Sequence, residues 1–164
     1  MIHPALLWGG VAAIGVGLFL WLGLPTVLKS FGLHPDYTGP TVQLPGKRAL
    51  VITTSHATLD RPGKTNGKAT GVFGSELTLP YYTFLDAGMS VDVASIRGGS
   101  IPIEPDSFRW FLATPADRRY LQDAEFQRKT AQSQSINTID FKSYDIIFLA
   151  GGWGAAYDLA QSET

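Results

Sequence analysis

One carboxylate stands out because its neighbours on a helix would all be apolar. The stretch 72–88 has apolar residues near helical spacing, and the residues three and four positions from Glu76 are Val72, Phe73, Leu79 and Pro80. We expect Glu76 to face a packed region, where desolvation raises the pKa of a carboxyl, as in a catalytic acid.

Pro80 offers no N–H to the Glu76 carbonyl, so the helix should distort there. If the helix is shorter, Glu76 instead lies in a solvated first turn and interacts with the helix dipole. The local pattern leaves both open.

A glycine-rich turn, "AGGWG" at 150–154, follows an apolar strand. Glycines at a strand end let the backbone approach a ligand and direct N–H groups at developing negative charge. Gly151 and Gly152 are therefore candidates for a backbone oxyanion site, and Trp153 is a candidate ligand contact. The alternative is a tight turn with Trp153 packed on the next helix. A dinucleotide-binding module is disfavoured, because the pattern is not G-x-G-x-x-G and "SVDVASIRGG" has no acidic residue at its strand end.

A histidine follows the first strand, in "TTSHA". Ligands of open α/β sheets bind beyond the carboxyl ends of the strands, so His56 and the loop through Lys64 and Lys68 lie in the right region. His56 is a candidate ligand-binding residue, although a lone histidine more often has a structural role. No Cys/His cluster or H-E-x-x-H spacing indicates a metal, and we expect no cofactor.

The elements that must position these residues alternate along the chain. The sequence predicts strands within 48–57, 90–96 and 144–150, a helix within 72–88, a polar, solvent-facing helix within 116–135 and the start of a last helix after the glycine turn. This order is typical of an α/β domain with a parallel sheet. Three strands are few for a doubly wound sheet, so we expect the domain to be incomplete at its C-terminus.

The first 31 residues are predicted to be a membrane anchor. Residues 4–28 carry no charge and would form a helix of about 37 Å, against a hydrocarbon core of about 30 Å. A cleaved signal peptide is the alternative, but no basic region precedes the apolar run. Lys29, Lys47 and Arg48 follow it, so the positive-inside bias favours a single-pass protein with a cytoplasmic domain at 47–164. Residues 32–46, rich in proline and glycine, are predicted to be a linker.

Composition excludes one class of partner and is consistent with the absence of disulfides. The 164 residues have a net charge of −1 and no cysteine. Without a basic face interleaved with aromatics, nucleic acid is not an expected partner. The lack of cysteine fits a chain without disulfides but does not choose a compartment.

Several pieces in fixed order resemble a known superfamily. They are "TSH", "K-x-TG-x-F-x-x-E", "AG-x-x-VD-x-AS", "GG-x-x-PI-x-P-x-S" and "YD-x-IF-x-x-GG-x-G" followed by "DL", from about Arg48 onward. In this order they resemble the N-terminal portion of the ThiJ/PfpI superfamily, which has a flavodoxin-like, class I glutamine amidotransferase-like fold. The closest likeness is to its heat-shock chaperone and glyoxalase III-like branch.

The resemblance implies roles for the candidate residues. Glu76 matches a glutamate that contacts a nucleophilic cysteine, and Gly151 and Gly152 match a glycine pair whose backbone helps form the oxyanion site. Trp153 departs from the pattern, because close relatives often have histidine there. The cysteine itself lies some tens of residues after the glycine pair, and this chain contains none.

The resemblance therefore implies an inactive piece of a larger parent. That parent would be a cysteine-dependent enzyme acting on small aldehydes such as methylglyoxal, or an amidohydrolase or a chaperone. Its substrate would be a small carbonyl compound or amide, and a homodimer is left open. The alternative is a complete, non-catalytic membrane-anchored binding module.

Overall fold

The computed structural model describes residues 4–33 and 38–162. The chain divides into two compact units, Met1–Gly39 and Pro40–Thr164, and each is described by itself.

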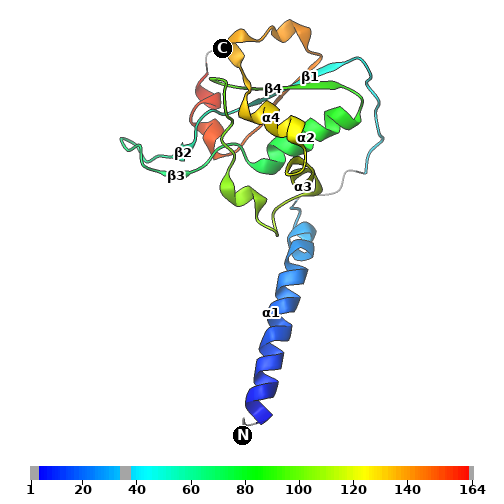
Figure 1. Ribbon diagram of the computed structural model, residues 1–164, viewed down its shortest axis with the longest axis vertical. Coiled ribbons are helices and arrows are strands. Elements are labelled where there is room, and N and C mark those ends of the chain that lie inside the picture. The colour runs from blue at the N-terminus through cyan, green and yellow to red at the C-terminus, as the bar shows by residue number, and fades with distance from the viewer. Residues whose placement is uncertain (1–3, 34–37, 163–164) are drawn as a thin grey trace. The chain divides into compact units, whose positions relative to one another are not determined.

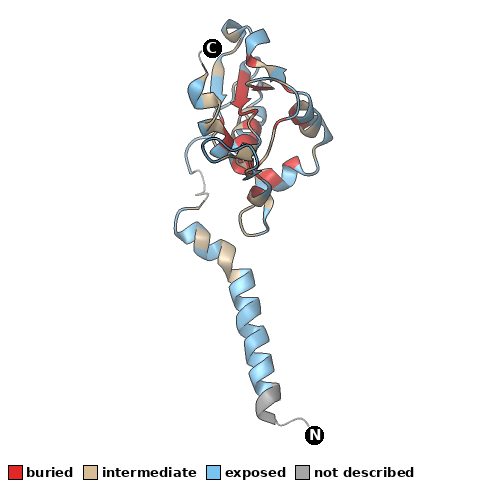
Figure 2. Ribbon diagram, turned by 90° about the vertical axis from the view of Figure 1, so that its left-hand side faces the viewer, coloured by how far each residue is buried: buried red, intermediate tan, exposed pale blue. Residues whose placement is uncertain are grey.

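The first unit is one long helix, α1, Pro4–Ser30. Its stretch Trp8–Ser30 has a mean hydropathy of 2.1, and by length and composition alone it could cross a membrane. The side chains described along it are mostly exposed (Figure 2). Pro25 lies within the helix, and Lys29 lies in its last turn.

The second unit is built on a parallel sheet with strand order β5-β4-β1-β6 (Figure 1). The strands are β1 Arg48–Thr53, β4 Ser90–Ser95, β5 Gln134–Ser135 and β6 Ile146–Leu149. β1 pairs in parallel with both β4 and β6, and every residue after Arg48 in it is buried. A continuous apolar run is expected of a central parallel strand, because both of its faces are buried. The three predicted strands are observed as β1, β4 and β6. A separate antiparallel ribbon joins β2 Thr58–Leu59 to β3 Lys68–Ala69.

Helix α2, Gly74–Asp86, packs on β1 and β4. The predicted polar helix at 116–135 is instead two short helices, α3 Pro115–Tyr120 and α4 Ala124–Ala131. The break arises because Asp123 caps α4, accepting a hydrogen bond from the Phe126 N–H at 3.0 Å. Much of the segment faces solvent, as predicted, but Tyr120 and Phe126 are buried.

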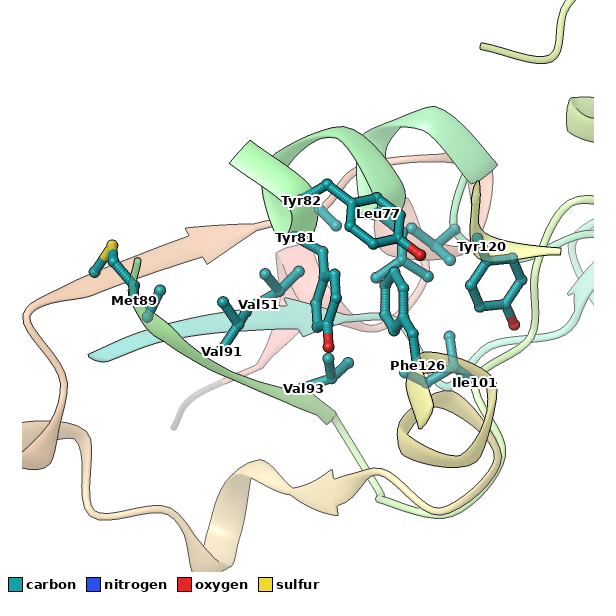
Figure 3. Packing of buried hydrophobic residues seen from close by; sticks show 13 residues of the cluster. Val51, Leu77, Tyr81, Tyr82, Met89, Val91, Val93, Ile101, Tyr120 and Phe126 are labelled. Atoms are coloured by element: carbon teal, nitrogen blue, oxygen red, sulfur yellow. The ribbon is translucent and has the colours of Figure 1, made fainter. Parts of the chain in front are cut away.

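Aromatic residues from three helices fill the core on the α2 side of the sheet (Figure 3). Phe126 is completely buried and stacks on Tyr81 with ring centroids 3.5 Å apart. Tyr82 and Tyr120 approach Phe126 edge-on, at 5.5 Å and 5.0 Å. Val51, Val91 and Val93 of the sheet belong to the same cluster.

The opposite face of the sheet has a thinner cover. Leu50, Ile52 and Ala94 cluster there with Ile136. The residues packed around them come from loops and 3-10 turns, and within the described part of the chain no α-helix contributes to this cluster.

The last segment also differs from expectation. The glycine turn leads into two 3-10 turns, η4 Trp153–Ala156 and η5 Leu159–Gln161, rather than into an α-helix.

Candidate active site

Three segments meet where β1 and β6 end. The Ala150 N–H donates to the Ile52 carbonyl at 2.8 Å, which keeps the end of β6 beside β1. The Gly154 N–H donates to the Gly71 carbonyl at 3.1 Å, and the Phe73 N–H donates to the Gly151 carbonyl at 3.4 Å. These bonds place the glycine turn against the residues that precede α2. The carboxyl edge of a parallel sheet is where open α/β proteins bind ligands.

Glu76 lies in the first turn of α2 and is exposed. Of the two alternatives, the packed environment is wrong, because the helix begins at Gly74 with Phe73 as its N-cap, and Leu79 is itself 40% exposed. The shorter-helix alternative describes the observed position. Pro80 is nevertheless accommodated inside the helix.

The carboxylate of Glu76 lies directly against Gly151. A methyl group added to the Gly151 α-carbon would overlap the Oε2 atom of Glu76. The missing side chain at this position is therefore what lets the carboxylate rest on the strand end. The structure thus brings together two of the residues that the sequence selected separately.

Gly152 has a conformation that favours glycine, with φ at 114°. A Cβ atom there would lie 2.5 Å from the Phe73 nitrogen and 2.7 Å from the Gly71 oxygen, so the backbone segments pack with no room for a side chain. In the part of the chain that the structure describes, the N–H groups of Gly151 and Gly152 donate no hydrogen bond. Two backbone donors are thus free next to a carboxylate.

Trp153 begins η4 and is 66% exposed. The alternative in which it packs on a following helix is wrong, because no α-helix follows the turn in the described residues. Its side chain is a large apolar surface adjoining the two free amides.

His56 is held by structural contacts at the same edge of the sheet. Its Nε2 atom lies 2.5 Å from the Thr58 carbonyl oxygen, which accepts a hydrogen bond from the ring. The ring stacks on Tyr157 with centroids 4.2 Å apart, and the Tyr157 hydroxyl donates to the Asp60 carbonyl at 2.8 Å. These contacts join Tyr157, the C-cap of η4, to the β2–β3 ribbon. Figure 1 shows η4 in red and the ribbon in teal. Of the two lysines in the loop region, Lys68 pairs with Asp106 at 2.7 Å.

Asp60 organises the loop between β2 and β3. The Thr58 hydroxyl and the Gly67 N–H donate to its carboxylate at 2.7 Å and 2.8 Å. These hydrogen bonds lower the pKa of the Asp60 carboxyl below its ordinary value, because they favour the ionised form.

Asp158 was not selected from the sequence but fixes the end of the glycine turn. Its carboxylate accepts from the Thr54 hydroxyl at 2.6 Å and from the Ser55 N–H at 2.8 Å. Thr54 is completely buried at the end of β1. Asp158 therefore positions the segment after Gly152 on the central strand. The "DL" that follows the glycine turn was the available signal, since it belongs to the matched pieces.

The candidate site contains polar groups, but the described residues include no set of metal ligands. Among residues 4–33 and 38–162, no cluster of three or more histidine, aspartate or glutamate side chains could hold a metal ion. What the arrangement offers is a carboxylate, two backbone N–H donors and an exposed aromatic ring. Such a set can move a proton and stabilise an oxyanion.

The fold and the site together define an α/β protein with a parallel sheet, whose candidate site lies where β1 and β6 end. No model of a protein family matches the chain. A glutathione-independent glyoxalase of Schizosaccharomyces pombe, hsp3102, is 31% identical over 119 residues, which are 71% of this chain and 48% of that protein. A probable glutathione-independent glyoxalase of Saccharomyces cerevisiae, SNO4, is 28% identical over 118 residues, with shares of 71% and 48%.

Solved structures of similar fold are also found. The Rapid Encystment Protein 24 kDa of Francisella tularensis superposes with a TM-score of 0.63 at 33% identity, over 71% of this chain and 49% of that one. Glyoxalase III of Candida albicans has a TM-score of 0.59 at 24% identity, a likeness of fold alone. The chain spans about half the length of the curated relatives it matches. These homologues support the ThiJ/PfpI superfamily that the sequence pieces indicated.

Proposed function

We propose that this chain provides one half of the active site of a membrane-anchored, ThiJ/PfpI-type glyoxalase that acts on small 2-oxoaldehydes without glutathione. The single observation that carries the proposal is the Glu76 carboxylate resting on Gly151, beside the free N–H groups of Gly151 and Gly152. The relatives named as glutathione-independent glyoxalases support the reaction class.

The reaction would begin with a thiolate that adds to the aldehyde carbon of the substrate. The aldehyde oxygen then gains negative charge, and the amides of Gly151 and Gly152 stabilise it by donating hydrogen bonds. Glu76, as a carboxylate, would accept and return the proton that moves between the two substrate carbons. Overall, a 2-oxoaldehyde and water give a 2-hydroxy acid, so no external oxidant or reductant is required.

The thiolate is the part that these 164 residues do not contain, since none is cysteine. A carboxylate cannot replace it, because the covalent step needs the sulfur nucleophile. We therefore expect the chain by itself to be inactive on aldehydes. Helix α1 would anchor the protein in a membrane with the α/β unit on the cytoplasmic side. Resistance of the full chain to extraction by alkaline carbonate tests the anchoring separately.

The catalytic proposal is tested by joining the full chain to the half of hsp3102 that it does not match. According to the resemblance, that half contributes the cysteine. We expect the fusion to consume methylglyoxal. The substitution Glu76→Gln should lower kcat/KM by about 10²–10⁴-fold, the usual worth of a positioned proton-transfer group.

The matched control for this test is Glu125→Gln. Glu125 is an exposed glutamate on α4 that pairs with Lys129 at 3.6 Å, and its substitution should leave the rate unchanged. A folded fusion with no activity, or with equal activity in the Glu76→Gln variant, would contradict the proposal.

A further inference from the structure

An exposed turn just before α3 has two adjacent aromatic residues at its tip. We call residues 109–113 the aromatic turn. The Leu112 N–H donates to the Arg109 carbonyl at 2.9 Å, which closes the turn. Trp110 and Phe111 lie between these two residues, and their rings meet edge-on with centroids 5.5 Å apart. Trp110 is 44% exposed. Turn tips are usually glycine, proline, asparagine, aspartate or serine, so paired aromatic residues at this place indicate an interaction surface.

Cationic side chains surround the aromatic turn. Arg109 and Lys68 pair with the same carboxylate, that of Asp106, at 2.9 Å and 2.7 Å. The Arg118 guanidinium donates to the last carbonyl of the turn at 2.8 Å, which holds this exposed side chain against it. Glu104, also near Lys68, is only 6% exposed and accepts a hydrogen bond from a threonine hydroxyl at 2.7 Å. Three exposed cations thus accompany one partly exposed carboxylate, and the surface beside the rings is positively charged.

We infer that the aromatic turn, together with Lys68 and Arg118, docks the α/β unit on the surface of an anionic lipid bilayer. Tryptophan is favoured at the headgroup level of a bilayer, because its ring is apolar while its N–H still finds a polar partner. Lysine and arginine close to an anionic leaflet add electrostatic attraction. The turn combines both features within a few residues, with the rings at the tip and the cations beside them.

A bilayer is favoured over a partner protein because the chain itself would hold the turn near lipid. This step rests on the proposed anchoring of α1 and not on the proposed catalysis. Residues 31–47 connect α1 to β1, and they span at most about 60 Å when fully extended. The α/β unit of an anchored chain therefore meets the bilayer at a high effective concentration, whereas a partner protein would bind from free solution.

The sign of the charge agrees with the proposed orientation. The cytoplasmic leaflet carries anionic lipids, and its surface potential is negative. A unit on the cytoplasmic side would therefore present its cationic turn to the leaflet that attracts it. The attraction is electrostatic, so it depends on the anionic lipid content and on salt.

The test measures the contact of Trp110 with lipid in the full chain reconstituted into vesicles. The chain has four tryptophans, so Trp8→Phe and Trp21→Phe are made in two matched variants. One variant also has Trp153→Phe and keeps Trp110; the other has Trp110→Phe and keeps Trp153, which is 66% exposed. The probe is a vesicle of phosphatidylcholine with about 30% phosphatidylserine and brominated acyl chains. We expect Trp110 fluorescence to shift to shorter wavelength and to be quenched at least about threefold more than that of Trp153.

The role of the cations is tested in the variant that keeps Trp110. Arg109→Glu should reduce its quenching at least about threefold, and so should vesicles of phosphatidylcholine alone, because each removes electrostatic attraction. Arg128→Glu is the matched control, since Arg128 is an exposed arginine on α4, outside the aromatic turn, and its substitution should leave the quenching unchanged.

Several results would overturn the inference. They are equal quenching of Trp110 and Trp153, equal quenching with and without phosphatidylserine, or equal effects of the two charge substitutions. Complete shielding of Trp110 already in detergent would also overturn it, because that result indicates a protein contact. Extraction by alkaline carbonate separates the docking from the anchor. A resistant chain whose Trp110 stays unquenched contradicts the docking alone, whereas a chain that carbonate releases but whose Trp110 is quenched by vesicles contradicts the anchor alone.

Discussion

Replacing Gly152 by alanine should destabilise the α/β unit. Two costs combine. A residue with a side chain at φ 114° carries backbone strain of about 1–3 kcal/mol. The added methyl group would lie 2.5 Å from the Phe73 nitrogen, and such overpacking against backbone costs about 1–3 kcal/mol more. We expect a loss of about 2–6 kcal/mol, out of a total of about 5–15 kcal/mol for a typical domain.

Two other glycines separate these costs. Gly99 has φ at 80° and nothing within 4 Å of its would-be Cβ, so Gly99→Ala measures strain alone. Gly151→Ala meets only the end of the flexible, exposed Glu76 side chain and should cost less than about 1 kcal/mol while displacing that carboxylate. The assay is urea unfolding of the full chain, with midpoint and slope determined for each variant. If Gly152→Ala lowers the free energy of unfolding no more than Gly99→Ala does, the close approach of Gly152 to Phe73 does not add the predicted overpacking cost.

Two further predictions concern the carboxylates around the site. Asp158→Ala leaves the Thr54 hydroxyl and the Ser55 N–H without their acceptor and should lower the free energy of unfolding by about 2–4 kcal/mol, measured by urea titration. Asp140→Ala removes an acceptor only from the exposed Lys142 N–H and should cost less than about 1 kcal/mol; equal costs would contradict the positioning role of Asp158. The lowered pKa of Asp60 means that its hydrogen bonds stabilise the fold above about pH 4, the unfolded value, and that this contribution is lost as the pH falls through the lower folded value. The urea midpoints of the unsubstituted chain and the Asp60→Asn variant should therefore differ at pH 7 and converge by about pH 2, and a constant difference would refute the assignment.

The sheet could be predicted from the sequence because its strands are continuous apolar runs. Residues 48–53, 90–95 and 146–149 are short, β-rich and bounded by glycine or polar segments, and nothing in tertiary packing overrides that signal. The segment 116–135 was misjudged because its composition is polar. Its two buried aromatics, Tyr120 and Phe126, lie on separate helices, and the Asp123 cap between them is a local feature that periodicity does not register.

The residues of the candidate site could be predicted from the sequence, but their exposure and their contacts with one another could not. Glu76 and Gly151 are 75 positions apart in the sequence, and only the fold shows that the carboxylate rests on the glycine. The sequence left the exposure of Glu76 open, because apolar neighbours along a helix do not reveal whether another element covers them. His56 was selected for its position at a strand end, yet its stacking on Tyr157 depends on a turn that the sequence did not predict.

The central place of β1 in the sheet affects how the protein is made. Its two neighbours come from distant parts of the chain, and the Arg48 N–H reaches its acceptor, the carboxylate of Asp145, across 97 positions of sequence. At about 5–20 residues per second, a ribosome needs roughly 5–20 s to synthesise that interval. During this time the apolar strand Ala49–Thr53 has no β6 beside it. Folding of this unit should therefore be slow and late, with nascent chains that depend on chaperones until translation has passed β6.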